Sequence, residues 1–363
     1  MRPDFGARRE RLAALLEADG FDGLLVSELA NIRYLTGFDG GWGRLVQGPL
    51  AHILVVDARY RDRAPDLPAG VELLVAEGVR TADAVREAVG LAGCTRLAFE
   101  PGALSWWEHG AISSRLQPGS RFSPAGGHVE ALRAIKDEGE RKLIAHAAAV
   151  TDRAIAAALA CAVPGEREID VAATLAAALR REGDGGAPAF EPLVAGGAGT
   201  ARIHARPSRR RLESGDLLLV DAGATISGLA ADCARTVVVG ERPDRRQREG
   251  LDVVQAALEA AIRCAEPGRP VRDLVRAAER RLARHGFGLA HDLGHGVGLE
   301  VHEEPRVAAD SDAVLAAGMV VAIEPGIYVP GWGGVRIEET VEVTPEGPLV
   351  LTAAPRFAGG ARF

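Results

Sequence analysis

Val220-Asp221-Ala222-Gly223 and Ile323-Glu324-Pro325-Gly326 place an acidic residue in the same short frame, 103 residues apart. The same offset relates Cys161-Ala162-Val163-Pro164-Gly165 to Cys264-Ala265-Glu266-Pro267-Gly268, and it also relates several single glycines. The chain therefore contains an internal duplication, and each copy delivers a carboxylate to an equivalent place.

The residues that follow the first carboxylate predict a strand hairpin. Asp221 ends an apolar run, a turn region follows it, and a second apolar run leaves the turn. Short apolar runs bounded by turn residues are typical of buried strands. A turn between Ile226 and Ser227 would place Asp221 directly across from Asp232.

The second copy repeats this pattern, and a turn at Gly331 would place Glu324 directly across from Glu338. Like charges that face each other on a strand pair are destabilising, and buried ones are costly unless they are protonated or bound to cations. Acids at solvent-exposed strand ends are the alternative interpretation. Four acids in duplicated frames favour a pair of metal ions instead.

Composition limits the classes of protein. With 363 residues and a net charge of −7, the chain is long enough for two domains and too acidic for a nucleic-acid or membrane-surface protein. No apolar run approaches the roughly 20 residues that span a bilayer, and Met1-Arg2-Pro3-Asp4 lacks an apolar signal segment. The four cysteines show no metal-binding or redox spacing, which is typical of free thiols in a reducing compartment. We therefore expect a cytoplasmic protein.

Helix and strand patterns alternate in the first part of the chain. We expect an amphipathic helix over about 6–19, a second helix over about 81–91, and strands near residues 24, 53, 73 and 97. This alternation favours an α/β domain over residues 1–127, because Ser123-Pro124-Ala125-Gly126-Gly127 interrupts the pattern.

The second part, residues 130–363, predicts an α+β domain. Each copy of the duplication begins with two helices, expected over about 137–162 and 168–183 in the first copy and 244–265 and 270–285 in the second. A strand hairpin follows each pair. The helices should cover the outer face of an antiparallel sheet whose inner face carries the acids.

Four histidines fall where a metal site would use them: His204, His291, His295 and His302. His295 lies in Gly294-His295-Gly296-Val297-Gly298, where the glycines permit close approach to the backbone. We interpret it as a nitrogen ligand, with a hydrogen-bonded core histidine as the alternative. The stretch His302-Glu303-Glu304-Pro305 lacks the second histidine of single-zinc peptidases, which excludes that class.

The ordered motifs resemble the pita-bread metallopeptidases, the group that contains methionine aminopeptidase, aminopeptidase P and prolidase. The resemblance covers about residues 130–352 and rests on His204, Asp221, Asp232, His295, His302, Glu324 and Glu338. The N-terminal part resembles creatinase-type N-domains, notably at Asn31-Ile32-Arg33-Tyr34-Leu35-Thr36-Gly37-Phe38. That domain implies the proline-peptide branch, Xaa-Pro dipeptidase or aminopeptidase, because methionine aminopeptidases lack it.

The resemblance implies two divalent metal ions. Asp221 would bind one, Asp232 and Glu338 would bridge both, and His295 and Glu324 would hold the second. Such an oxygen-rich site suits manganese, with cobalt, iron or zinc as further occupants. A water shared by the metals would supply the attacking hydroxide, and the metals would polarise the scissile carbonyl.

The resemblance also implies roles for residues around the metals. Glu324 would shuttle the proton, and His204 and His302 would donate hydrogen bonds to the substrate and the developing oxyanion. His291 would line the proline subsite. Arg336 would either meet a substrate carboxylate or brace Glu338. The expected partners are a small peptide substrate and a second copy of the chain in a homodimer.

Leu229, Ala231, Ala234 and Glu339 depart from the family pattern near the bridging carboxylates. These changes remove hydrogen bonds around the ligands without removing a ligand. Three functions therefore stay open: a Xaa-Pro metallopeptidase, a metal-dependent hydrolase of a non-peptide amide, and a catalytically inactive binding protein. The complete ligand set favours the first.

Overall fold

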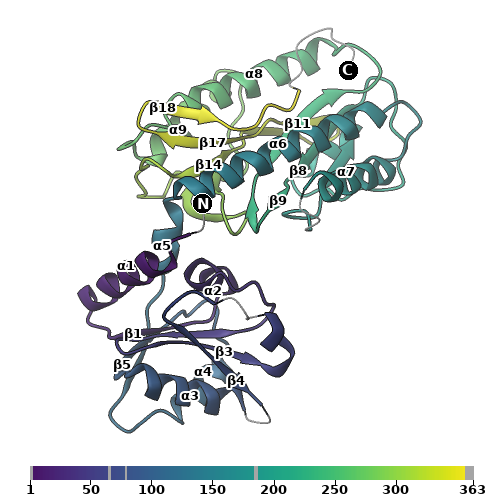
Figure 1. Ribbon diagram of the computed structural model, residues 1–363. Helices are drawn as coiled ribbons and strands as arrows, with labels where there is room; N and C mark the ends of the chain where they lie inside the picture. The colour runs from purple at the N-terminus through teal and green to yellow at the C-terminus, as the bar shows by residue number, and fades with distance from the viewer. Residues whose placement is uncertain (1–2, 64–66, 78–79, 184–186, 356–363) are drawn as a thin grey trace. The chain divides into compact units, whose positions relative to one another are not determined.

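The computed structural model describes residues 3–63, 67–77, 80–183 and 187–355 (Figure 1). The chain divides into two units, Met1–Arg133 and Ala134–Phe363. Each unit has its own hydrophobic core, and the predicted site residues all belong to the second unit.

A six-stranded mixed sheet forms the centre of the first unit, in the order β4-β3-β2-β1-β5-β6. β1 pairs antiparallel with β2 and parallel with β5, while β3 pairs antiparallel with β2 and parallel with β4. The strands are β1 (Gly23–Val26), β2 (Arg44–Gln47), β3 (His52–Asp57), β4 (Val71–Ala76), β5 (Arg96–Phe99) and β6 (Arg121–Pro124). The four expected strands are thus present as β1, β3, β4 and β5, whereas β2 and β6 were not predicted, and Ser123 and Pro124, which were expected to interrupt the pattern, belong to β6.

Helices cover both faces of this sheet, with α1 and α2 on one side and α3 and α4 on the other (Figure 1). Their bounds are α1 (Phe5–Ala18), α2 (Leu29–Thr36), α3 (Thr81–Ala92), α4 (Trp106–Ser113) and α5 (His128–Ala134), with a 3₁₀ turn η1 (Ala58–Arg63) after β3. The side chain of Asp4 caps α1, and Ser105 and Glu108 form a capping box at α4. The predicted α/β architecture of this part is confirmed.

The second unit repeats one order of elements twice. The first copy contains α6 (Glu138–Cys161), α7 (Glu168–Glu182), β8 (Leu217–Ala222), β9 (Thr225–Ile226), β10 (Leu229–Ala230) and β11 (Cys233–Val238). The second contains α8 (Arg245–Ile262), α9 (Val271–Ala283), β14 (Val320–Ile323), β15 (Gly326–Val329), β16 (Gly333–Arg336) and β17 (Glu339–Thr344). The additional elements are β7 (Leu193–Gly196), η2 (Gly197–Ala201), β12 (Gly294–Gly296), β13 (Glu303–Val307) and β18 (Gly347–Val350). Both predicted helix pairs are therefore present.

The duplication extends to single backbone contacts. An isolated bridge joins Arg167 to Arg211 in the first copy, and an isolated bridge joins Pro270 to Val314 in the second. Both residues of the second bridge follow those of the first by 103 positions, which is the offset found in the sequence. In both copies, therefore, the same kind of bridge connects the start of the second helix, α7 or α9, to the segment before the hairpin.

The described strands of the second unit form two larger antiparallel sheets, β11-β8-β7 and β13-β12-β14-β17-β18, and two two-stranded sheets, β9-β10 and β15-β16. Hydrogen bonds join the two larger sheets through β11 and the segment before β17. The Glu338 N–H donates to the Ala234 carbonyl, and the Thr236 hydroxyl donates to the Arg336 carbonyl. α6 and α7 pack with β8 in one core, and α8 and α9 pack with β14 and β17 in another. Asp221 lies in β8, and Asp232, Glu324 and Glu338 lie directly beside β11, β14 and β17.

The two hairpin predictions fared differently. β8 pairs with β11 so that Asp221 faces Ala234, which makes the predicted direct pairing with Asp232 wrong. The turn is centred on Ser227 and Gly228, whose φ angles are 48° and 82°, one residue later than expected. Because moving the turn by one residue moves the pairing by two, Asp221 and Asp232 remain on the same face as diagonal neighbours.

In the second hairpin, Ile323 faces Glu339 and Gly326 faces Arg336. Both pairings fit a turn at Gly331, and this register places Glu324 opposite Glu338, as predicted. The two acids occupy the gap between the paired stretches, so the ladder opens where they lie.

Among the described helices, only α6 is long and apolar enough to cross a membrane. Its Val150, Ala154 and Ile155 are nevertheless fully buried in the core with α7 and β8. This is the placement of a core helix in a globular domain. The capping box of Asp137 and Glu140 fixes where α6 begins.

Candidate metal centre

Five residues predicted as metal ligands come together at strand ends in the second unit. Asp221 lies in β8 and Asp232 directly precedes β11, while His295 is the middle residue of β12. Glu324 directly follows β14, and Glu338 directly precedes β17. The two copies of the duplication therefore deliver their carboxylates to one place.

These side chains line a single cavity with a volume of about 1160 Å³. Part of its wall is apolar and comes from α7, where Ile169, Ala172, Ala173 and Ala176 follow each other at helical spacing. The remaining predicted site residues line the same cavity: His204, His291, His302 and Arg336.

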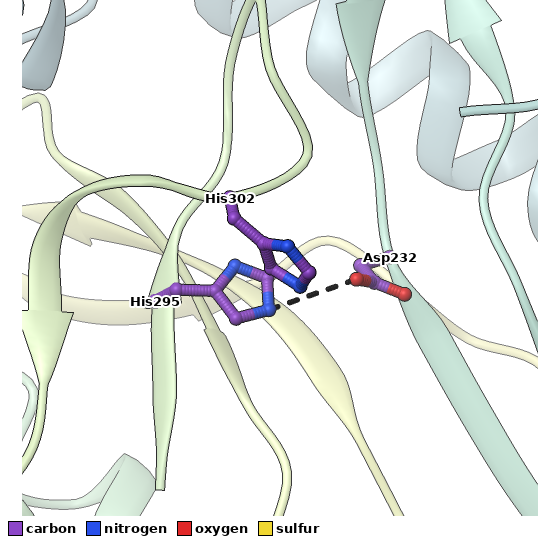
Figure 2. A group of neighbouring side chains, drawn as sticks. All are labelled: Asp232, His295 and His302. Carbon is purple, nitrogen blue, oxygen red and sulfur yellow. Dashed lines mark ion pairs between the residues drawn. The ribbon is translucent and has the colours of Figure 1, made fainter. Parts of the chain in front are cut away.

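The ligand atoms lie close enough for shared coordination. Nε2 of His295 is 3.8 Å from Oδ2 of Asp232 (Figure 2). The same nitrogen is 3.7 Å from Oε1 of Glu324. Three sets of possible ligand atoms each lie within 4.8 Å of one another: Asp232, His295 and His302; His295, Glu324 and Glu338; and Asp221, Asp232 and Glu338. Any two of these sets share one residue, as a site for two adjacent cations requires.

Burial controls the electrostatics of this cluster. Burial and the neighbouring carboxylates raise the pKa of Asp232 and of Glu338 well above the ordinary range. Burial also raises the pKa of Glu324 to about 8. Burial and the adjacent His302 lower the pKa of His295 to about 4, so its imidazole is neutral at pH 7 and able to bind a metal.

The donor set fits divalent cations. Oδ1 of Asp221 and Oδ1 of Asp232 are buried and have no hydrogen-bond partner among the described residues. A buried carboxylate oxygen without a partner is costly, and a cation would remove that cost. Four carboxylates with one imidazole form a hard, oxygen-rich set of the kind that manganese prefers.

Arg336 braces a ligand rather than pointing freely into the cavity. Its Nη2 donates to Oδ2 of Asp221, and its Nη1 donates to the Tyr328 hydroxyl at 3.0 Å and to the Ile203 carbonyl at 3.1 Å. The side chain is 4% exposed. Of the two roles expected for Arg336, this geometry favours bracing, and the braced residue is the predicted ligand Asp221 instead of Glu338.

The three further histidines occupy different places around the cavity. The rings of His302 and His295 are perpendicular with centroids 4.2 Å apart, so His302 lies beside the ligands (Figure 2). Nε2 of His291 is 3.0 Å from the Tyr328 hydroxyl, and burial lowers the pKa of His291. His204 is exposed on the segment that follows η2.

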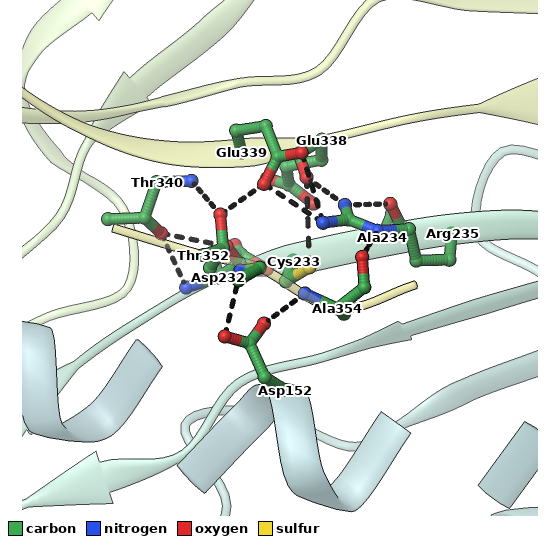
Figure 3. A network of polar contacts seen from close by, with 11 residues as sticks. Asp152, Asp232, Cys233, Ala234, Arg235, Glu338, Glu339, Thr340, Thr352 and Ala354 are labelled. Carbon is green, nitrogen blue, oxygen red and sulfur yellow. Dashed lines mark hydrogen bonds and ion pairs between the residues drawn. The ribbon is translucent and has the colours of Figure 1, made fainter. Parts of the chain in front are cut away.

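A buried polar network surrounds the backbones of Asp232 and Glu338, the two acids predicted to bridge the metals (Figure 3). Arg235 donates both to the Glu338 carbonyl at 2.5 Å and to the two carboxylate oxygens of Glu339 at 2.9 and 3.0 Å. The Thr340 hydroxyl donates to the Asp232 carbonyl at 2.7 Å and accepts from its N–H at 3.0 Å. The backbones of both acids are therefore fixed from behind by side chains of the opposite strand.

Comparison with known families assigns both parts of the chain. The model of metallopeptidase family M24 matches residues 142–345, and the model of the creatinase/prolidase N-terminal domain matches residues 8–135. The chain is an M24 metallopeptidase. The resemblance inferred from the motif residues is confirmed.

Several relatives of this M24 metallopeptidase match it over nearly the whole chain. A Pyrococcus furiosus protein named Xaa-Pro dipeptidase is 33% identical over 96% of this chain and 98% of its own. The solved structure of a Xaa-Pro dipeptidase from Bacillus anthracis has a TM-score of 0.93 at 33% identity, covering 98% of this chain and 99% of that one. A solved X-Pro aminopeptidase from Thermotoga maritima has a TM-score of 0.86 at 32% identity, covering 96% and 99%.

Sequence reasoning missed residues of the metallopeptidase site that act through other side chains. Tyr328 contacts both His291 and Arg336, and the only signal for it was its place in the strand after Glu324. Arg235 was also missed, because its partners, two backbone carbonyls and the buried Glu339 carboxylate, belong to no motif.

Proposed function

We propose that this metallopeptidase holds two metal ions and cleaves the peptide bond before proline, in Xaa-Pro dipeptides or at the N-terminus of longer peptides. The observation that carries the proposal is the pair of ligand sets that share Glu338: one with His295 and Glu324, the other with Asp221 and Asp232. Relatives named Xaa-Pro dipeptidase and X-Pro aminopeptidase support the substrate class.

Each cation would have its own ligands in this arrangement. Asp221 would hold one, His295 and Glu324 would hold the other, and Asp232 and Glu338 would bridge both. The unpartnered oxygens of Asp221 and Asp232 support this assignment. We propose manganese as the native metal, because carboxylates dominate the donor set.

The bound cations would supply Lewis-acid chemistry, lowering the pKa of a water molecule and polarising the scissile carbonyl. Glu324 would accept a proton from the attacking water and would donate it to the proline nitrogen as the C–N bond breaks. The position of Glu324 supports this role, because its carboxylate lines the cavity 3.7 Å from Nε2 of His295, beside the other candidate ligands.

The surrounding histidines would bind the substrate. His302 and His204 would donate hydrogen bonds to the carbonyl oxygen as its charge develops and to the substrate backbone. His291 would line the proline subsite, because Tyr328 and burial keep its neutral imidazole in place at the cavity wall. We also propose that the enzyme is cytoplasmic and that it forms a homodimer. Sedimentation analysis of the purified protein would test the homodimer.

The test is hydrolysis of Ala-Pro, Ala-Pro-Ala, Ala-Ala and Met-Ala by metal-stripped enzyme, with and without added manganese. We expect manganese-dependent cleavage of the Xaa-Pro peptides only, and the ratio of dipeptide to tripeptide rates distinguishes dipeptidase from aminopeptidase. An enzyme that binds two metals and cleaves none of the four would contradict the proposal and favour a non-peptide amide as substrate.

A further inference from the structure

A buried ion pair joins Lys136 to Glu303, and no step of the proposed reaction uses it. Nζ of Lys136 lies 2.7 Å from Oε1 of Glu303, and the side chains are 1% and 4% exposed. Burying both charges costs free energy, so such a pair is weak evidence for stability. A pair of this kind suits a different task, which is to hold two segments in one arrangement.

Lys136 is fixed to the strand that leads to Glu324. Its backbone N–H donates to the Gly318 carbonyl at 2.9 Å, and Ile135 forms an isolated bridge with Met319. Gly318 and Met319 run directly into β14, which Glu324 follows. One end of the ion pair is therefore attached to the backbone that carries a metal ligand.

Glu303 is fixed to the strand that carries His295. It is the first residue of β13 and pairs with Gly296, the residue after His295 in β12. A Cβ atom at Gly298 would lie 2.2 Å from Oε1 of Glu303, so the glycine leaves room for the carboxylate. The preceding residue is His302.

His302 has few side-chain contacts that could fix its orientation. The segment 297–302 contains no helix or strand, and the His302 imidazole makes no hydrogen bond to any described residue. Its one ring contact is with His295 (Figure 2). The orientation of His302 is thus set by the backbone on either side, and the Glu303 side chain anchors that backbone on one side.

We propose that the Lys136–Glu303 ion pair is a positioning device that holds His302 beside His295, facing the metal ligands. Its catalytic consequence rests on the proposed function, because His302 must contact the substrate for its position to affect turnover. A displacement of about 1 Å in a catalytic group costs on the order of 100-fold in rate. The effect should appear in kcat rather than KM if His302 acts mainly on the developing oxyanion.

The kinetic test compares Lys136→Met with Lys142→Met on Ala-Pro in the manganese-loaded enzyme. Lys142 is the only other lysine in the chain and is exposed, so it is the matched control. We expect Lys136→Met to lower kcat about 10- to 100-fold with KM within about threefold, and Lys142→Met to change neither.

A double variant tests whether Lys136 acts through His302. Adding Lys136→Met to His302→Ala should lower kcat less than about threefold further, because both changes disable the same group. Losses that multiply would overturn the proposal.

A second measurement needs no turnover. The ¹H–¹³C signal of the His302 imidazole, assigned by its absence in His302→Ala, should shift or broaden in Lys136→Met and stay unchanged in Lys142→Met. If Lys136→Met does not fold, Glu303→Gln gives the same comparison, because it keeps the shape and removes the charge. A His302 signal that stays unchanged when the ion pair is disrupted would refute the positioning role. A wild-type enzyme that does not cleave Xaa-Pro peptides would refute only the proposed function.

Discussion

Glu324 links the protonation of the site to the stability of the metal-free protein. Burial raises its pKa from 4.5 to about 8, so the folded state keeps a proton that the unfolded state releases near pH 4.5. The stability contributed by this group is therefore complete below about pH 4.5 and falls as the pH rises towards 8. The upper limit of this loss is about 5 kcal/mol, since one pKa unit corresponds to about 1.4 kcal/mol.

Urea unfolding of metal-free protein between pH 5 and 8 checks this expectation. The free energy of unfolding should decrease with pH in the wild type, and the decrease should be shallower in Glu324→Gln, which carries no titrating group there. Asp232 and Glu338 also have raised pKa values, so part of the slope should remain in the variant. Equal slopes in both proteins would contradict the assignment to Glu324.

Arg336 holds Asp221 through a geometry that lysine does not reproduce. A guanidinium donates to Asp221 and to Tyr328 at once, whereas an ammonium is a single point charge. We expect Arg336→Lys to lower kcat/KM about 10- to 100-fold and to weaken metal binding in titration calorimetry. Tyr328→Phe removes two hydrogen bonds, one with Arg336 and one with His291, each worth about 1 kcal/mol, and should cost roughly 5- to 30-fold. A larger loss in Tyr328→Phe than in Arg336→Lys would argue against this order of roles.

At the scale of elements, the join between β11 and β17 supports both bridging candidates. The Arg235 and Glu339 side chains are 1% and 0% exposed, and their bidentate pair lies directly behind Glu338 (Figure 3). Glu339 occupies a position that departs from the family pattern, yet it has full hydrogen bonding here: Arg235 on one side and the Thr352 hydroxyl on the other. The expected loss of contacts at this position did not occur.

Neutralising Glu339 should therefore weaken both the fold and the metal site. We expect Glu339→Gln to lower the free energy of unfolding of the metal-free protein by about 1–3 kcal/mol, because the buried Arg235 charge loses its partner. Metal affinity should fall with it, since Arg235 also holds the Glu338 carbonyl. Glu249→Gln, which breaks an exposed pair with Arg245, is the control and should cost less than about 0.5 kcal/mol in urea unfolding. Equal effects of the two changes would contradict the role of burial.

The hairpins show how far local sequence determines these elements. Gly331 has a φ of 81° and marks its turn unambiguously, so the register around Glu324 followed from the sequence. The other turn uses Ser227, a residue that rarely adopts a positive φ, and the sequence therefore pointed to the neighbouring position. The short strand β2 lacked a distinctive pattern, because its first and last residues, Arg44 and Gln47, are polar although all four are buried.

At the scale of the whole molecule, the duplicated frames predicted which acids meet, because two copies of one fold bring equivalent positions together. They did not reveal the supporting contacts of Lys136 with Glu303 or of Arg235 with Ala354. These contacts join segments more than 100 residues apart and have no repeated frame. The candidate ligands, which the structure brings together, were thus accessible to sequence reasoning, whereas the residues that position them required the structure.

Division into two units predicts that metal removal affects one of them. All sets of possible ligands found among the described residues belong to the second unit, and the first unit has a separate core. Ligand at 100 times its Kd stabilises the state that binds it by about 2.7 kcal/mol, which corresponds to roughly 100-fold slower opening-limited exchange. Chelation should therefore speed amide hydrogen exchange in β8, β11, β14 and β17 by up to about this factor and leave exchange in β1, β3 and β5 unchanged.

Hydrogen exchange measured by mass spectrometry with and without EDTA checks this expectation. Asp221→Asn is the control variant, and EDTA should change exchange in its second unit less than in the wild type. Equal acceleration in both units would show that the metal site stabilises the chain as one cooperative body, and no acceleration in either would contradict metal binding by these carboxylates.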